Sequence, residues 1–464
     1  MSSGQISDDI TIAAISTPPG VGGVGIVRMS GSLSFSILEK IFLPKNSSCS
    51  YQSHKLYYGQ LVDPFSGKMV DEVLAVFMRG PNSYTREDVV ELHCHGSYLV
   101  LENTLKLVLD CGAQLAAPGE FTKRAFLNGR IDLTQAEAVV DILSAKTQKG
   151  VDLGLEQLSG ALYRRIEPCR QSLVRAKAVV EVAIDFPDDD VEIVDHSQLV
   201  VQLTEEVQKP LQKLLKGAGQ GKLYRDGVSL VIAGRPNVGK SSLLNALLQE
   251  DRALVTSVPG TTRDSIEEII DISGIPVRII DTAGIREGVC EVEELGIERA
   301  RELINRADFV VFLIDGATGV TEEDRLLYEQ VAHKPLVPVV NKSDLCGDNE
   351  LDLSWMATEV APVVISARNQ DNIEGLRNTL FAQITSAAGV WEEDGCAPNL
   401  RHKLALGAAI DAVQGVLDTL GAGLTCDLVA VDLQGALDAL NDIVGETTPD
   451  DVLDAVFEQF CLGK

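Results

Sequence analysis

The chain has 464 residues, 45% of them hydrophobic, and a formal net charge of −28, so we expect about three domains with sizeable cores. The acidic balance argues against general affinity for nucleic acids, which requires Lys and Arg, although RNA held by a local surface or a basic partner stays possible. Nine scattered cysteines do not suggest a disulfide framework. With neither a signal peptide nor an apolar run long enough to span a membrane, we expect a reduced, cytoplasmic compartment.

The first quarter of the chain alternates short apolar runs with turn residues, which indicates an α+β domain. His93 and His95 would share one face of a strand there. No third ligand is close in sequence, so we favour a structural or hydrogen-bonding role for them over a metal site. We expect strands at Ile10–Ile15, Gly25–Met29, Lys55–Val62 and Val73–Met78, and a helix over Tyr98–Cys111.

Helical periodicity follows from Leu133 to Asp185, returns over Ser197–Lys216, and returns again after residue 400. The glycine-rich stretch Gly217–Gly221 is predicted to be a linker. The carboxylates within Asp185–Asp190 fit a solvated loop better than a cation site. We interpret the helical stretches as halves of one domain that is interrupted by the central segment; the alternative is two separate helical domains.

The central segment, residues 227–385, alternates strand and helix patterns, as expected for a parallel sheet with crossover helices. Near-continuous apolar character indicates strands covered on both faces. These strands are predicted at Val228–Ala233, Val277–Asp281, Phe309–Asp315, Val337–Asn341 and Val363–Ser366.

The first of these strands leads into a loop that fits the pattern G-x-x-x-x-G-K-[ST], from Gly234 to Ser241, and that opens a helix. Gly234 and Gly239 allow the backbone N–H groups to turn inward and cradle phosphates. Lys240 can reach the β- and γ-phosphates, and the Ser241 hydroxyl can ligate Mg²⁺. The loop therefore predicts a nucleotide site.

A second motif, Asn341-Lys342-Ser343-Asp344, predicts that the nucleotide is GTP. The Asp344 carboxylate can accept two hydrogen bonds from guanine, and adenine lacks that donor pair. The order of these motifs is that of the small-GTPase fold. In that fold Asp281 would hold Mg²⁺ through a water molecule, and the Thr262 hydroxyl would ligate it directly. The predicted GTP contacts are Asn237, Val238, Gly239, Lys240, Ser241, Ser242, Thr256, Ser257, Val258, Pro259, Gly260, Thr261, Thr262, Asp281, Thr282, Ala283, Gly284, Asn341, Lys342, Asp344, Ser366 and Ala367.

The hydrolytic mechanism differs from that of Ras-type enzymes, which place a Gln after the Asp-x-x-Gly segment to orient the attacking water. Ile285 occupies that position here. Asn237 and the oxygens of Thr256–Thr261 suit a hard monovalent cation, which could take the place of an arginine finger. The alternative is that Asn237 is a loop residue with no catalytic consequence.

Over its whole length the chain resembles the tRNA-modification GTPase MnmE (TrmE) family. The resemblance implies a multidomain α/β and α+β fold: a folate-binding-like N-terminal dimerisation domain (1–128) and an all-α helical domain (129–226 and 388–464), interrupted by an inserted Ras-like P-loop GTPase domain (227–387). Besides the GTPase motifs, it rests on Pro18-Pro19-Gly20, Gly22–Gly25 and Arg28, on Gly119-Glu120-Phe121 and Arg124–Asn128, on Asp185-Phe186-Pro187, and on the terminal Cys461-Leu462-Gly463-Lys464.

The resemblance also implies a mechanism. Hydrolysis would be stimulated by K⁺ bound to Asn237, Thr256, the carbonyl of Val258 and Thr261, with Mg²⁺ on Ser241 and Thr262. Lys240 and Asn237 would be catalytic together with Glu293, whose carboxylate would orient the attacking water.

The family acts as a homodimer, and as a heterotetramer with the FAD-containing protein MnmG. The pair installs an aminomethyl or carboxymethylaminomethyl group at C5 of the wobble uridine of certain tRNAs. A tetrahydrofolate derivative of the 5-formyl or methylene type supplies the carbon, and FAD belongs only to the partner. The folate pocket would use Arg28, Glu91 and Arg130, with Lys464 or Cys461 nearby; family members often carry Lys where this chain has Arg130.

Two alternative functions stay open. A regulatory GTPase of ribosome assembly would need an RNA-binding accessory domain with basic and aromatic residues, which the sequence does not show. A folate enzyme with an attached regulatory GTPase would turn over without MnmG.

Overall fold

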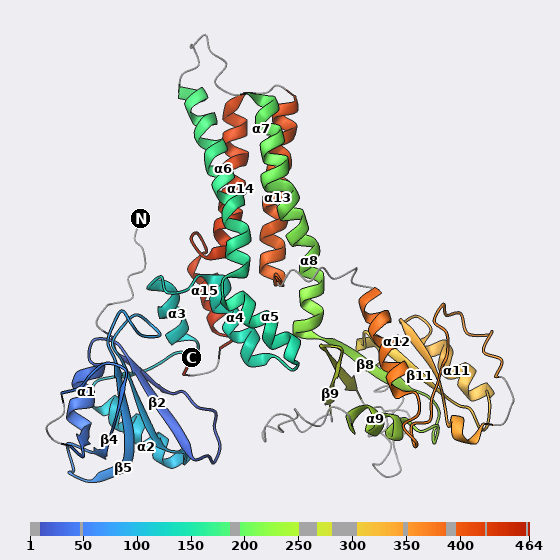
Figure 1. Cartoon of the computed structure of the whole chain (residues 1–464), viewed down its shortest axis with the longest axis horizontal. Coiled ribbons are helices and arrows are strands. Elements are labelled where there is room, and N and C mark those ends of the chain that lie inside the picture. Colours follow the sequence, from blue (N-terminus) through green and yellow to red (C-terminus); the bar gives the residue numbers. More distant parts are fainter. Residues whose placement is uncertain are drawn as a thin grey trace. The chain divides into compact units, whose positions relative to one another are not determined.

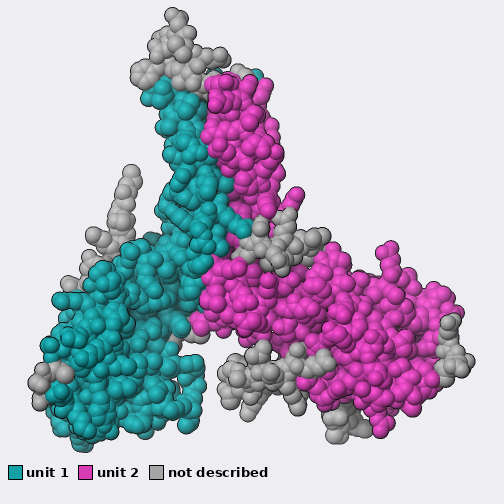
Figure 2. Space-filling view, viewed as in Figure 1, with its two compact units in different colours: residues 1–140, 158–193, 422–464 teal, residues 141–157, 194–421 magenta. Residues whose placement is uncertain are grey.

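The computed structural model describes residues 10–46, 50–185, 195–249, 267–280, 304–346, 351–386, 396–422, 425–460 and 463–464. The chain forms two compact units, each built from segments that are distant in sequence (Figure 2). Unit 1 contains Met1–Val140, Leu158–Ile193 and Ala422–Lys464, and unit 2 contains Asp141–Gln157 and Val194–Gly421.

Unit 1 begins with a seven-stranded sheet in the order β3-β4-β5-β6-β2-β1-β7, antiparallel except for the parallel β1–β7 pair. Helices α1 and α2 pack on one face of this sheet (Figure 1). The bounds are β1 Ile12–Ile15, β2 Val24–Ser30, α1 Ser34–Ile41, β3 Phe42–Pro44, β4 Lys55–Val62, β5 Met69–Met78, β6 Val89–His95, α2 Tyr98–Asp110 and β7 Gln114–Leu115.

Strands β4 and β5 alternate buried and exposed residues, because only one face is covered there. In β4, Tyr57 and Leu61 are buried, whereas Leu56 and Tyr58 are exposed. Strand β1 is buried on both faces, since Ala13 packs in the core with α1 and α2 and Ile12 and Ala14 pack with Phe121. The expected strands in this region are present, with β2 and β5 longer than predicted. Sequence patterns missed α1, β3 and β7, which are short and lack sustained periodicity.

The C-terminal helix α15 (Asp450–Phe457) packs against α3 (Glu120–Leu127) of the same unit. Gly119, just before α3, has φ +67°, and a Cβ there would lie 2.5 Å from the Phe457 carbonyl oxygen. The position therefore admits only glycine. Phe457 and Phe460 share an apolar cluster with Leu133 of α4 (Leu133–Ser144), which joins the C-terminal segment to the first half of the chain.

Helix α6 (Ala161–Asp185) packs along α14 (Cys426–Val444), also within unit 1 (Figure 1). Arg170 donates to Glu446 at 3.1 Å, and Lys177 donates to Gln434 at 2.5 Å. Pro168 lies inside α6 without ending it. The carboxylates of Asp188–Asp190 lie outside the described residues, so their expected loop stays a prediction.

In unit 2, helix α8 (Lys209–Asp226) follows α7 (His196–Leu203) through a π-helical turn and packs against α13 (Leu400–Gly421). The predicted linker at Gly217–Gly221 is wrong, because α8 runs through it. A Cβ at Gly221 would lie 2.5 Å from the Cβ of Ala397, so the glycine permits close packing rather than a break.

Helix α13 is long and apolar enough to cross a membrane by length and composition alone. Its buried residues nevertheless recur at helical spacing, from Leu406 through Val413 to Leu420, as in a helix that packs against α7 and α8.

The second sheet, in unit 2, has the order β13-β12-β11-β8-β10-β9. Its pairs are parallel except for the antiparallel β9–β10 pair at one edge, where β9 is a strand that the sequence patterns missed. The strands are β8 Val228–Ala233, β9 Glu267–Ile272, β10 Ile275–Ile280, β11 Phe309–Asp315, β12 Leu336–Asn341 and β13 Val363–Val364.

Helices cover both faces of this sheet. Leu313 of β11 packs in one core with α9 (Lys240–Gln249) and α12 (Ile373–Ser386), whereas the neighbouring Phe312 packs in the other with α11 (Glu322–Val331). This two-sided burial explains the unbroken apolar runs in the sequence. The chain thus has the multidomain α/β and α+β fold that was expected, while the residue limits of the domains stay a prediction.

Candidate functional site

The phosphate loop connects β8 to α9 at the carboxyl edge of the sheet, where α/β proteins bind their ligands. Gly239 has φ +102°, and a Cβ there would lie 2.2 Å from the Asn341 side-chain nitrogen. The Lys240 Nζ donates to the carbonyls of Gly234 and Arg235, at 2.8 and 2.9 Å. The loop therefore curls around its own lysine, the shape needed to enclose phosphate oxygens.

Asn237 stands in the left-handed region, at φ +62°. Asn is one of the few residues other than Gly that adopt this conformation readily. Its carbonyl accepts a hydrogen bond from the Lys342 Nζ at 2.9 Å, so the backbone of the proposed cation ligand is tied to the guanine motif.

Asn341, at the end of β12, connects the phosphate loop to the loop that follows β13. Only 2% of the Asn341 residue is exposed. Its Nδ2 donates to the Val238 carbonyl at 2.8 Å, and its Oδ1 accepts from the Ala367 N–H at 3.0 Å. Both hydrogen-bonding groups of the amide are satisfied, so Asn341 fixes the positions of the two loops that would flank the base.

Asp344 is the predicted guanine acceptor, and the Ser366 hydroxyl donates to its Oδ1 at 2.5 Å. The structure thus gathers the described part of the predicted GTP site, namely Asn237 to Ser242, Asn341, Lys342, Asp344, Ser366 and Ala367. The remaining predicted residues lie outside the described part of the chain: Thr256, Ser257, Val258, Pro259, Gly260, Thr261, Thr262, Asp281, Thr282, Ala283, Gly284 and Glu293.

Sequence reasoning missed Asp315 as a site residue. Its Oδ2 lies 2.6 Å from the Lys342 Nζ. Burial opposes its ionisation, but the hydrogen bond from Lys342 and the N–H groups of Ala317 and Thr318 outweigh burial and lower the pKa of the carboxyl. An acidic residue that ends an apolar strand was the available signal, because Asp315 pairs in register with Asn341.

A second candidate site lies on the face of the N-terminal sheet opposite α1 and α2, where Phe121 and Tyr84 cover part of the sheet. Arg28 and Glu91 face each other on β2 and β6 and form a 2.8 Å ion pair. The Arg28 guanidinium lies 5.7 Å from the ring centroids of both Tyr84 and Phe121. Charge and aromatic rings therefore occur together around this pair.

Two other predicted folate residues also border this region. The Arg130 guanidinium lies 4.7 Å from the Tyr84 ring centroid and donates to the Tyr84 carbonyl. The Phe121 N–H donates to the backbone oxygen of Lys464 at 3.3 Å. Tyr84 was missed, because a lone tyrosine in a loop carries no motif; Cys461 lies outside the described residues.

His93 and His95 of β6 pair with carboxylates. His93 Nε2 lies 3.4 Å from Glu91, and His95 Nδ1 lies 2.7 Å from Asp71. Among the described residues, no group of three or more His, Cys, Asp and Glu side chains is placed to hold a metal ion. The hydrogen-bonding role expected for these histidines agrees with these contacts.

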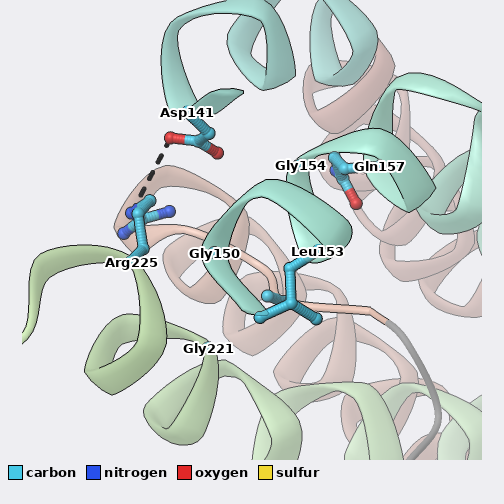
Figure 3. Close-up of a pocket in the computed structure, with 8 residues that line it drawn as sticks. Asp141, Gly150, Leu153, Gly154, Gln157, Gly221 and Arg225 are labelled. Atoms are coloured by element: carbon cyan, nitrogen blue, oxygen red, sulfur yellow. Dashed lines mark ion pairs between the residues drawn. The ribbon is translucent and has the colours of Figure 1, made fainter. Parts of the chain in front are cut away.

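Figure 3 shows a small hollow in unit 2, lined by Leu153, Gly154 and Gln157 of α5 (Gln148–Leu158) and by residues of α8. An ion pair of 3.8 Å between Asp141 and Arg225 lies beside it. Its volume of about 20 Å³ admits nothing larger than a water molecule, so it is not a substrate site.

The largely parallel sheet, the phosphate loop and the guanine motif define a P-loop GTP-binding domain. The family model described as "MnmE helical domain" matches residues 133–461, and "GTP-binding protein TrmE N-terminus" matches residues 11–130. The chain therefore belongs to the MnmE family of tRNA modification GTPases.

Relatives of similar length support this assignment. A "tRNA modification GTPase MnmE" from Desulfotalea psychrophila is 56% identical over 463 residues, or 99% of both chains. One of the same name from Geotalea uraniireducens is 47% identical, over 98% of this chain and 99% of that one. The solved structure of Era from Aquifex aeolicus is 25% identical over 40% of this chain and 66% of that chain; its TM-score of 0.27 is too low to support an inference.

Proposed function

We propose that this chain is a K⁺-stimulated GTP hydrolase that works in tRNA wobble-uridine modification. The observation that carries the proposal is the connection of the guanine motif to the phosphate loop, through Asn341 to Val238 and through Lys342 to the carbonyl of Asn237. The names of the full-length relatives supply the substrate class, tRNA.

The hydrolytic step would use the family's cation mechanism. Lys240 and Mg²⁺ on Ser241 and Thr262 would offset phosphate charge. K⁺ would occupy a site made by Asn237, Thr256, the Val258 carbonyl and Thr261, and Glu293 would orient water. The left-handed backbone of Asn237 supports this role, since it is a conformation that few side chains adopt.

The test compares GTP hydrolysis in K⁺ and in Na⁺. We expect much faster turnover in K⁺, and we expect Asn237→Ala to abolish the difference while GTP binding persists. Gln249→Ala, at the far end of α9, is the matched control and should keep the K⁺ preference. Equal wild-type rates in both salts would refute the cation mechanism.

We infer that the Arg28 and Glu91 region binds the tetrahydrofolate derivative, of the 5-formyl or methylene type. A pterin carries the same pattern of ring N–H and amino donors as guanine, so a carboxylate such as Glu91 can accept from it, and Tyr84 and Phe121 offer aromatic faces. Arg130 and Lys464 border the region. Glu91→Gln should weaken folate binding in calorimetry; unchanged affinity would count against this site.

The proposed assembly is a homodimer that joins MnmG, the FAD-containing partner, in a heterotetramer in the cytoplasm. The exposed part of the N-terminal sheet supports dimerisation, because Val24, Leu56, Tyr58 and Leu74 are exposed on its strands. The installed group would be aminomethyl or carboxymethylaminomethyl at C5. Mass spectrometry of tRNA nucleosides after gene deletion tests the modification, and unchanged wobble uridine would refute it.

A further inference from the structure

Unit 1 contains a recess of about 410 Å³ between the loop that precedes α4 and the start of α6. This volume falls in the range of small-molecule sites. The lining is polar: Arg130 and Asp132 come from the loop, Gln135 from α4, and Tyr163 and Arg164 from α6. The GTP site uses none of these residues.

The recess adjoins the proposed folate pocket through one aromatic ring. The Tyr84 ring centroid lies 5.7 Å from the Arg28 guanidinium and 4.7 Å from that of Arg130. Arg130 in turn lines the recess. Arg130 therefore borders both the proposed folate pocket and the recess within the same unit.

The charges in the recess favour an anion. Arg164 donates to the carbonyl and the hydroxyl of Ser159, which engages only two of the five N–H donors of its guanidinium. Arg130 donates one hydrogen bond, to the Tyr84 carbonyl. The carboxylate of Asp132 also lines the recess, but its Oδ1 accepts from the Thr134 hydroxyl and the Gln135 N–H at the start of α4.

We propose that this recess binds the poly-γ-glutamyl tail of the folate, with Arg130 and Arg164 pairing with its carboxylates. The proposal rests on the folate assignment made above and adds the class of substrate, a polyglutamylated rather than a monoglutamylated folate. Guanidinium groups are well suited to carboxylates because they can bind them in bidentate fashion. Each added glutamate brings another carboxylate toward the two arginines.

The experiment measures binding of 5-formyltetrahydrofolate with one and with five glutamates to the full-length chain by calorimetry. We expect the pentaglutamate to bind at least about tenfold more tightly, the gain expected of one charge-assisted contact. Arg164→Gln should reduce the pentaglutamate affinity to that of the monoglutamate and leave the monoglutamate unchanged. Arg175→Gln, at an exposed position of α6 away from the recess, should retain the preference.

Arg164→Lys guards against a structural explanation, because it keeps the charge and should keep part of the preference. Equal affinity of the wild type for both ligands would overturn the recess site and leave the folate assignment standing. Equal loss in the Arg164→Gln and Arg175→Gln variants would also overturn it. Absence of binding of either folate would overturn the folate assignment itself, and the recess proposal with it.

Discussion

Lys342 of the predicted guanine motif donates to the Asn237 carbonyl of the phosphate loop and forms an ion pair with Asp315. Only 7% of the Asp315 side chain is exposed, and its pKa is lowered, so the carboxylate stays ionised at neutral pH. The contribution of this pair to stability is complete above the ordinary carboxyl pKa and is lost as the pH falls through the lower, folded-state pKa.

We expect Asp315→Asn to weaken guanine-nucleotide binding about tenfold and to destabilise the chain by about 1–3 kcal/mol, because Lys342 loses a charged hydrogen-bond partner. Titration with a fluorescent GDP analogue and urea unfolding measure the two effects. Asp352→Asn, at a turn near Ser354, is the matched control and should change neither. Wild-type affinity in Asp315→Asn would contradict the anchoring role.

His95 carries the second prediction at this scale. The hydrogen bond to Asp71, together with attraction between the charges, raises the pKa of His95 above 6.5. Protonated His95 therefore stabilises the fold below pH 6.5, and this contribution disappears as the pH rises through the raised pKa.

We expect Asp71→Asn to lower the His95 pKa toward 6.5, as followed by NMR titration of its ring protons. His95→Gln should remove the same pH-dependent part of the stability near neutral pH. A His95 pKa that is unaffected by Asp71→Asn would show that the hydrogen bond is not its cause.

At the scale of elements, two glycines within α8 affect its stability and packing in different ways. Gly221 faces Ala397 at a distance that excludes a Cβ, whereas a Cβ at Gly217 would lie 3.8 Å from the Cys396 carbonyl oxygen, an ordinary contact. Both positions are helical, so the substitutions separate intrinsic helix propensity from packing.

We expect Gly217→Ala to stabilise the chain by about 0.5–1 kcal/mol, since alanine favours the helix. Gly221→Ala should destabilise it despite the same gain in propensity, because its methyl group would overlap Ala397. Thermal unfolding measures both variants. The same sign for the two changes would mean that packing against Ala397 does not control this helix.

At the scale of the whole molecule, the GTPase segment is flanked in sequence by two helices of unit 2 that pack on each other. Helix α8 leads directly into β8, and α13, after the segment, packs back on α8. Leu153 and Tyr224, from outside the predicted 227–387 domain, belong to the core of its sheet.

We expect replacement of residues 227–387 by a short Gly-Ser linker to leave a helical remainder that still unfolds cooperatively, as monitored by circular dichroism. The free energy of unfolding of this remainder should be lower by about 2 kcal/mol because Leu153, which packs in the core of the removed sheet, becomes exposed. A Leu153→Ser change in the shortened chain should then cost little. Absence of a cooperative transition would contradict the insertion of one domain into the other.

Much of this architecture follows from local signals. The phosphate loop, the guanine motif and the buried strands depend on residues adjacent in sequence, so the chain order alone predicts them. By contrast, the continuous helix α8 and the aromatic role of Tyr84 depend on residues far apart in sequence. The antiparallel strand β9 was missed although its signal is local, since it forms a hairpin with β10 across Ser273 and Gly274. Propensity is a weak guide where tertiary contacts override it.

The sequence by itself thus determined the class of site, because phosphate and guanine recognition require particular residue types at fixed spacing. Only the tertiary structure decided which distant side chains support it. Asp315 reaches Lys342 because neighbouring parallel strands end at one edge of the sheet. Arg130 and Arg164 share a recess because α4 and α6 begin side by side, and such proximity in space leaves no periodic mark in the chain.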